Sequence, residues 1–267
     1  MYKRRRGVRH QAVADARCGC QTPGVIETDA IVLRAIRYGE ADSVLTLYTR
    51  ERGRLSAIAQ GTRKATSKLG GRLQPSVLVH LGLHQGRGDL CTVRHAQVID
   101  AHAGLWVEGY RLRASSSILE AAARILMEEE PNEGAFNVLC RGLAHLSRAE
   151  PSDRPPRHDP IVLGVHAKLL VVAGILPRLA ACTGCGSDGP FTAFSARTGG
   201  ALCAECAHLG EPVRPEVFQG LVELVGRPLA DSEIHPFPAG VADGIERMIG
   251  AVLQEHLGVR LRSGVAL

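Results

Sequence analysis

Long hydrophobic runs and aromatic residues are what this chain has least of. No apolar stretch reaches the ~18 residues that a membrane-spanning helix needs. The first twenty residues are basic but contain no apolar core segment, which argues against a secretory signal. Aromatic residues make up only 4% of the chain, so a binding surface built on stacked aromatic rings is not expected. These absences predict a cytoplasmic protein without membrane contact.

Catalytic motifs are also missing. The sequence contains no GxSxG, HExxH or GxGxxG pattern and no paired-carboxylate motif. Its eleven histidines are dispersed. His80 and His84 are four residues apart, but on a predicted strand and turn rather than on one helix face, so no metal site is expected there. The sequence therefore predicts a protein that is not an enzyme.

Four of the eight cysteines form two CxxC pairs. Seventeen residues separate Cys182 and Cys185 from Cys203 and Cys206, a spacing typical of zinc ribbons. Two thiolates in a CxxC turn reach one metal ion at about 2.3 Å each, and the second pair completes a tetrahedron. Gly199 and Gly200 predict the two-residue turn of a β-hairpin between the pairs. We therefore expect these four cysteines to bind one structural Zn²⁺.

Other uses of these cysteines fit the pattern less well. A redox CxxC usually begins a helix in a βαβ unit, which the surrounding sequence does not predict. A catalytic zinc ion needs an open coordination position, and four thiolates leave none. His208 is a possible substitute ligand but is expected at the surface. The remaining cysteines, for which no metal role is expected, are Cys18, Cys20, Cys91 and Cys140.

Charge is distributed unevenly along the chain. Residues 1–24 carry six Lys/Arg and one acid, which gives +5. Residues 25–100 carry eleven Lys/Arg and seven acids, which gives +4, and residues 101–267 carry fifteen and nineteen, which gives −4. A basic N-terminal half suggests an anionic partner, with nucleic acid the commonest kind. The alternative interpretation is that the positive charge of this half serves only to keep the protein soluble.

From residue 25 to about residue 100 the sequence has the pattern of β-strands. Apolar residues alternate with polar ones, and turn signals occur at residues 50–53 and 86–89. No helix is long enough for a parallel crossover, which favours a small antiparallel barrel. The strands are expected over residues 30–36, 43–49, 55–59, 77–83 and 90–99.

From about residue 105 the apolar residues recur at helical spacing. Asn132 precedes one such segment and is expected to be its N-cap. The segment 158–173 is apolar around most of its circumference, so its helix should be central and buried. The other helices are expected over residues 105–126, 132–147, 215–225 and 241–257.

One predicted loop is strongly basic. Residues 61–72 carry four Lys/Arg and no acid, and the GxxxxGK[ST] order of a Walker loop is missing. The hydroxyl groups of Thr62, Thr66 and Ser67 suit contact with phosphate. We expect this loop and the first strand to contact nucleic acid through charge. The candidate residues are Arg34, Arg37, Arg63, Lys64, Lys68 and Arg72.

Further arginines in the barrel region are expected to add positive charge. They are Arg50, Arg52, Arg54 and Arg87. Some of these side chains are expected to form ion pairs with Glu40, Asp42 or Glu51 instead.

Several short segments match one protein family. They are residues 27–34, 38–42, 45–53, 61–68 and 73–75, together with residues 194–197, Gly199 and Gly200 within the cysteine module. On these segments the chain resembles the bacterial RecO recombination-mediator proteins. The resemblance covers about residues 25–260, and the helical part contributes least to it.

The resemblance implies an α+β multidomain fold. After a basic, disordered tail at residues 1–24, it implies an OB-fold β-barrel at residues 25–103. An α-helical bundle follows at residues 104–181 and 207–260, with a four-cysteine zinc ribbon inserted at residues 182–206.

The resemblance also implies a function without a catalytic residue. RecO proteins bind single- and double-stranded DNA, anneal complementary strands and act with RecR and single-strand-binding protein. They thereby help to load RecA, an indirect partner, during DNA repair. A cytoplasmic, nucleoid-associated location follows from this function.

Other functions stay open at this point. OB folds and zinc ribbons also occur in nucleic-acid-binding regulators of transcription or translation that have no annealing activity. A zinc-dependent enzyme and a scaffold that binds only proteins are further alternatives.

Overall fold

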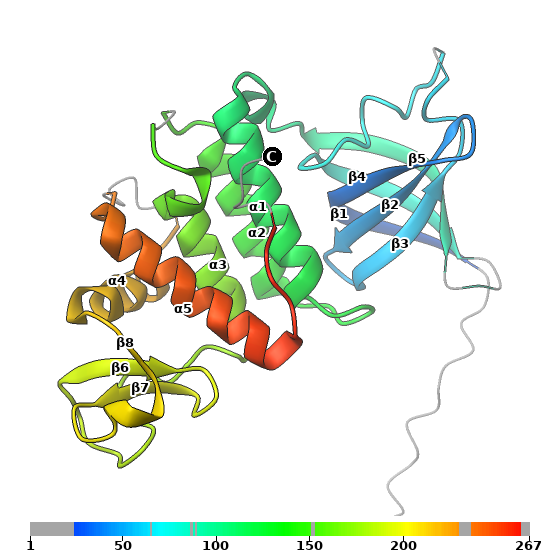
Figure 1. Cartoon of the computed structure of the whole chain (residues 1–267). Helices are drawn as coiled ribbons and strands as arrows, with labels where there is room; N and C mark the ends of the chain where they lie inside the picture. The colour runs from blue at the N-terminus through cyan, green and yellow to red at the C-terminus, as the bar shows by residue number, and fades with distance from the viewer. Residues whose placement is uncertain are drawn as a thin grey trace, which may run out of the picture.

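A computed structural model describes residues 24–64, 66–85, 88, 90–150, 153–229 and 236–262. The predicted basic tail lies outside the described residues except for Gly24, as do Cys18, Cys20 and Arg87. The described chain forms a β-barrel, a group of helices and a small three-stranded sheet, and Figure 1 shows the helices between the other two parts. This arrangement confirms the expected fold class.

Five strands close the barrel in the order β1-β2-β3-β5-β4. All neighbours are antiparallel except for a short parallel contact between β3 and β5. The strands are β1 (Val25–Tyr38), β2 (Asp42–Thr49), β3 (Gly53–Ala59), β4 (Leu78–Gln85) and β5 (Cys91–Asp100). The hairpin turn predicted at residues 50–53 joins β2 to β3.

The first strand is buried on both faces over residues 30–33 and is longer than the sequence predicts. Ala30 and Val32 point into the barrel core, whereas Ile31 and Leu33 belong to the core shared with the helices. A strand buried on both faces loses the usual alternation of apolar and polar residues, which explains the continuous apolar run. β1 then bulges between Val32 and Arg34 and continues as an exposed arm of the β1–β2 hairpin.

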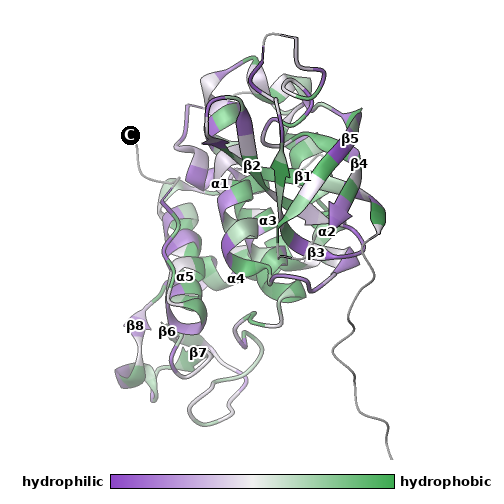
Figure 2. Cartoon of the chain, turned by 90° about the vertical axis from the view of Figure 1, so that its right-hand side faces the viewer, coloured by the Kyte–Doolittle hydropathy of each residue, from purple (hydrophilic) through white to green (hydrophobic). Residues whose placement is uncertain are grey.

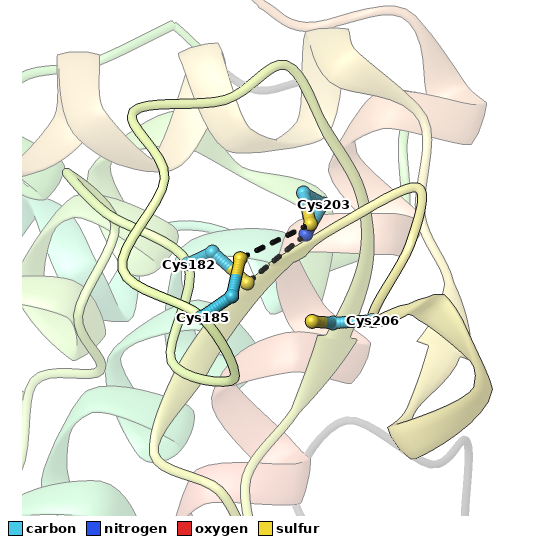
Figure 3. Close-up of side chains that lie close together, drawn as sticks. All are labelled: Cys182, Cys185, Cys203 and Cys206. Carbon is cyan, nitrogen blue, oxygen red and sulfur yellow. Dashed lines mark hydrogen bonds between the residues drawn. The ribbon is translucent and has the colours of Figure 1, made fainter.

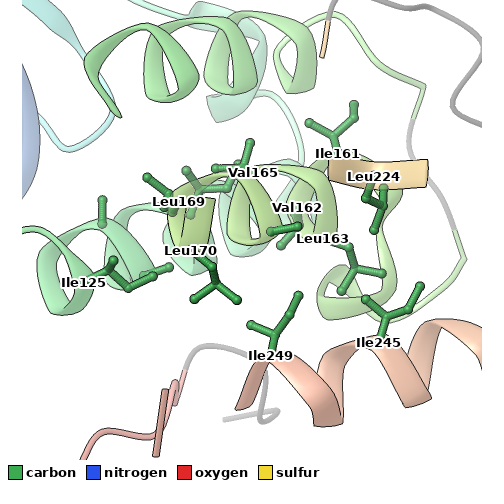
Figure 4. Packing of buried hydrophobic residues seen from close by; sticks show 14 of the residues in the cluster. Ile125, Ile161, Val162, Leu163, Val165, Leu169, Leu170, Leu224, Ile245 and Ile249 are labelled. Carbon is green, nitrogen blue, oxygen red and sulfur yellow. The ribbon is translucent and has the colours of Figure 1, made fainter. Parts of the chain in front are cut away.

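The helical part surrounds one apolar helix. It comprises α1 (Gly109–Ile125), α2 (Glu133–Leu146), α3 (Pro160–Val172), α4 (Pro215–Gly226) and α5 (Ala239–Leu257), with short 3₁₀ turns η1 (Ala103–Trp106) and η2 (Pro156–His158). Side chains of α3 lie among Ile125, Leu224 and Ile249 of three other helices (Figure 4). The prediction that α3 is central is confirmed.

Polar caps fix where two of these helices begin. The Asn132 side chain accepts a hydrogen bond from the Ala135 amide at the start of α2, as predicted. Asp159 does the same for Ile161 at the start of α3. By contrast, α5 is amphipathic, and Figure 2 shows purple and green alternating along it. Its apolar side faces the core.

The cysteine module forms the third part of the chain. Its sheet has the order β7-β6-β8, with β6 (Phe191–Ser195), β7 (Gly200–Cys203), β8 (Glu211–Pro212) and the 3₁₀ turn η3 (Ala207–Leu209). Ser195 pairs with Gly200, so the turn has four residues and Gly200 opens β7. The two-residue turn predicted at Gly199 and Gly200 is therefore wrong. Phe194 packs into the helical core and holds the sheet against it.

No helix within the described residues combines the length and the apolar content needed to cross a membrane.

Candidate nucleic-acid interface and metal centre

The basic loop is docked on the β1–β2 hairpin. The Arg63 amide donates a hydrogen bond to the Ala41 carbonyl oxygen at 2.9 Å, and the Arg63 Nη1 donates to the Gly39 carbonyl oxygen at 3.3 Å. The Gly61 amide donates to the Asp42 Oδ1 at 2.8 Å. In Figure 1 the loop rises beside the turn between β1 and β2 at one end of the barrel. These contacts hold two separate basic segments together.

All six candidate cations lie on these two segments and are exposed, and five of them are not tied to another strand through the side chain. We call these five the hairpin surface: Arg34 and Arg37 on β1, with Arg63, Lys64 and Lys68 in the loop. None of the five forms an ion pair with another described residue. Positive charges at an exposed site that no carboxylate neutralises are suited to bind an anion.

Arg72 occupies a different position from the other candidates. Its Nη1 donates to the Ala96 carbonyl oxygen at 2.9 Å, which anchors the end of the loop on β5. Leu73, which follows, is buried in the barrel core. Arg94 is an exposed cation on the same strand that the sequence analysis did not select. Its place on the exposed face of a predicted strand is the signal that could have identified it.

Two of the three loop hydroxyl groups are used inside the protein. Thr62 is buried, and its Oγ1 lies 2.8 Å from the Ser43 Oγ. The Ser67 Oγ accepts hydrogen bonds from the Leu69 and Gly70 amides, both at 3.2 Å. The expectation that the Thr62 hydroxyl contacts phosphate is therefore wrong, whereas the Ser67 hydroxyl keeps its hydrogen to donate and Thr66 is exposed.

Two barrel arginines turn toward the helices. The Arg54 Nε donates to the Leu126 carbonyl oxygen at 2.9 Å, and its Nη1 lies 3.0 Å from the Glu128 Oε1. The Arg50 Nη1 lies 3.6 Å from the Glu133 Oε1. The expectation that Arg50 and Arg54 add to the basic surface is wrong, because carboxylates far away in the sequence neutralise them.

The four cysteines of the CxxC pairs gather around one point (Figure 3). Their Sγ atoms all lie within 4.8 Å of one another, and the Cys185 and Cys203 sulfurs are 3.6 Å apart. A tetrahedron with bonds of about 2.3 Å has edges of about 3.8 Å, so the cluster has the size of a four-thiolate metal site. A Cβ on Gly184 would lie 2.8 Å from the Cys206 Sγ, which explains the glycine there.

Backbone amides favour the thiolate form of two of these sulfurs. The Cys203 amide donates to the Cys182 Sγ at 3.4 Å and, with other amides, lowers the pKa of Cys182 to about 6. The Cys206 amide lowers the pKa of Cys203 in the same way. Burial raises the pKa of Cys206 to about 12. Because thiolates bind metal ions and thiols do not, metal binding here must release the Cys206 proton.

Comparison with known proteins covers both halves of the chain. Residues 24–102 match the family model "Recombination protein O N terminal", and residues 108–264 match "Recombination protein O C terminal". The chain belongs to the RecO family. The resemblance found in the sequence is thereby confirmed, and the family's proteins act in DNA repair.

Two relatives named "DNA repair protein RecO" illustrate how much of the chain is shared. The protein from Anaeromyxobacter dehalogenans is 32% identical over 243 residues, which cover 88% of this chain and 93% of that protein. The protein from Rubrobacter xylanophilus is 34% identical over 233 residues, which cover 85% of this chain and 88% of that protein. The similarity therefore includes the barrel, the helices and the cysteine module.

Proposed function

We propose that this RecO-family protein is a DNA-binding recombination mediator that acts without a catalytic centre. It binds single- and double-stranded DNA through the hairpin surface and anneals complementary strands. With RecR, it helps to load RecA on DNA covered by single-strand-binding protein. The observation that carries this proposal is the set of five exposed cations, without ion-pair partners among the described residues, at one end of the barrel.

Annealing needs the repulsion between two phosphate backbones to be reduced. Lysine and arginine side chains that contact phosphates release counterions, and this release dominates affinity without reading the sequence. Tyr38, 58% exposed at the end of β1, is the aromatic side chain available beside these cations. A surface with one aromatic ring and five cations favours binding by charge over base recognition.

In the same proposal the four cysteines bind one Zn²⁺ with a structural role. Zinc binds four thiolates tetrahedrally, and the sulfur cluster has the matching size. Cys182, Cys185, Cys203 and Cys206 fill every position, so the ion stabilises the sheet of β6, β7 and β8.

The salt dependence of DNA binding tests the hairpin surface. We expect the triple variant Arg63→Ala, Lys64→Ala, Lys68→Ala to lower the slope of log K against log salt by ~0.9 per lost phosphate contact on duplex DNA, or ~2.7 in total. The matched control removes three exposed arginines of the helical part: Arg124→Ala, Arg141→Ala, Arg148→Ala. An unchanged slope in the first variant, or an equal fall in the control, would remove the hairpin surface from the proposal.

A nucleic-acid-binding regulator without annealing activity is the alternative to separate. Strand-annealing rates and capture of purified RecR distinguish the two functions. DNA binding without faster annealing and without RecR capture would favour the regulator.

A further inference from the structure

A second group of potential metal ligands lies between η2 and α5. His158 ends η2, and Asp243 and Glu246 are three residues apart on α5, so their carboxylates share one face of the helix. The His158 Nε2 lies 3.4 Å from the Asp243 Oδ1 and 3.6 Å from the Glu246 Oε2. One ligand atom from each of the three residues lies within 4.8 Å of the others.

The Nε2 atom of His158 is buried but lacks a hydrogen-bond partner among the described residues. The residue as a whole is only 7% exposed. A neutral imidazole that directs a lone pair at two carboxylates is repelled by them. Either a hydrogen on Nε2, in the neutral or the charged ring, or a metal ion between the three groups removes this repulsion.

The distances distinguish these two possibilities. A protonated imidazole donating to a carboxylate brings nitrogen and oxygen to about 2.7–2.9 Å. Both nitrogen–oxygen distances here are longer by at least half an ångström, and both also exceed the ~3.2 Å limit of a neutral N–H···O hydrogen bond. Ligands about 2.0–2.1 Å from a tetrahedral ion are about 3.4 Å apart. The observed separations therefore fit ligands around an ion better than a direct hydrogen bond.

The surroundings allow an ion to enter. The Asp243 and Glu246 side chains are 44% and 37% exposed, so the carboxylate side of the group opens to solvent. Two arginines already reduce its negative charge: Arg157 Nε lies 3.2 Å from the Glu246 Oε2, and Arg247 Nη2 lies 3.9 Å from the Asp243 Oδ2. An incoming cation competes with Arg157 for one oxygen, which favours moderate affinity.

The geometry points to a divalent-cation site formed by His158, Asp243 and Glu246. One imidazole nitrogen and two carboxylate oxygens suit Zn²⁺ or Mn²⁺ and differ from the all-sulfur set of the CxxC pairs. Three protein ligands leave a coordination position for water. The bound ion links η2, directly before α3, to α5 and holds two helices together that are distant in sequence.

Mn²⁺ alone is the probe for this site, because this ion prefers imidazole and carboxylate ligands to thiolates. The full-length protein, with the cysteine site saturated by Zn²⁺, is titrated with Mn²⁺ while the free ion is followed by its paramagnetic resonance signal. We expect one bound Mn²⁺ per chain and a rise in Tm. Affinity should fall at least tenfold in His158→Gln and in Asp243→Asn.

Two control variants on α5 show whether the loss of Mn²⁺ binding is specific to this group of ligands. Glu255→Gln and His256→Gln change an exposed carboxylate and an exposed imidazole outside the group and should leave Mn²⁺ binding unchanged. Asp243→Asn alters a half-exposed side chain, so the test remains valid if His158→Gln does not fold. Absence of saturable Mn²⁺ binding, or equal binding in Asp243→Asn and the wild type, would overturn the site.

Discussion

The guanidinium carbon of Arg50, directly after β2, lies 4.5 Å from the centre of the Phe136 ring on α2. The same guanidinium reaches Glu133 at the start of this helix. Nearby, the Tyr48 hydroxyl donates to the Asn132 carbonyl oxygen at 3.3 Å. The first turn of α2 is therefore one of the places where the barrel is attached to the helices, and Arg50 serves this contact rather than the basic surface.

Arg50→Ala should lower the free energy of unfolding by ~1–2 kcal/mol, because it removes a partly buried cation–π contact together with its ion pairs. Arg37→Ala, which removes an exposed arginine of the same barrel without an ion pair, should change it by less than ~0.5 kcal/mol. Urea unfolding curves measure both values. Equal values for the two variants would mean that the Arg50 contact does not stabilise the fold.

Gly53 is required where β3 begins. Its φ is +66°, and a Cβ would lie 2.2 Å from the Glu130 carbonyl oxygen of the loop before α2. Gly53→Ala should therefore cost ~3 kcal/mol or more, as backbone strain and a clash with main chain combine. Gly39→Ala is the matched control and should cost only ~1 kcal/mol: its φ is +57°, but among the described residues beyond its chain neighbours no atom would lie within 4 Å of an added Cβ. Similar losses in both variants would exclude the clash as the cause.

Much of the fold follows from local patterns in the sequence. A continuous apolar run predicted the first barrel strand and alternation supported the others, while helical spacing with the Asn132 cap predicted the helices. The two ends of β1, residues 25–29 and 37–38, were not predicted, because all of these residues except Thr28 are exposed or only partly buried. Local hydrophobic pattern does not predict strands that are exposed on both sides.

The candidate sites also differ in whether local sequence could predict them. The cysteine cluster could be predicted because each CxxC turn is local and the two turns need only one hairpin between them. The group of His158, Asp243 and Glu246 could not, because its members are far apart in the chain and meet only when α5 packs beside η2. The partners of Arg50 and Arg54 escaped prediction for the same reason: charge patterning does not identify distant carboxylates.

His166 should make the stability of the protein depend on acid pH. Burial lowers the pKa of this histidine on α3 from 6.5 to about 4 in the folded chain. Below pH 6.5 the unfolded chain binds a proton that the folded chain excludes, so stability falls until the pH reaches about 4, by ~3 kcal/mol in total. Urea unfolding across this pH range measures the loss.

The variant His166→Gln isolates this effect. A glutamine amide can still donate to the Ser117 carbonyl oxygen, which the His166 Nε2 approaches at 3.2 Å, but it does not titrate. We expect the variant to lose ~3 kcal/mol less than the wild type over the same pH range. His256→Gln, an exposed histidine on α5, should follow the wild type. A wild-type pH profile in His166→Gln would contradict the assignment.

Metal removal should weaken the C-terminal part of the protein first. Phe194 of the small sheet packs into the helical core, and Phe191 lies edge-on to Phe218 of α4 with ring centres 6.0 Å apart. Loss of the ion frees the two cysteine turns and loosens these contacts. Because 1 kcal/mol shifts Tm by ~2–4 °C in a chain of this size, a loss of ~2 kcal/mol would lower Tm by ~4–8 °C. Calorimetry with and without a chelator, and of Cys185→Ser, measures this shift.

DNA binding is the second measurement on the metal-free protein. The small sheet and the barrel lie on opposite sides of the helices (Figure 1), so the hairpin surface does not depend on the cysteine turns. We therefore expect the salt slope of duplex binding to stay unchanged in Cys185→Ser while Tm falls and proteolysis within residues 182–206 increases. A reduced slope at a temperature where the barrel is still folded would instead place the cysteine module in contact with DNA.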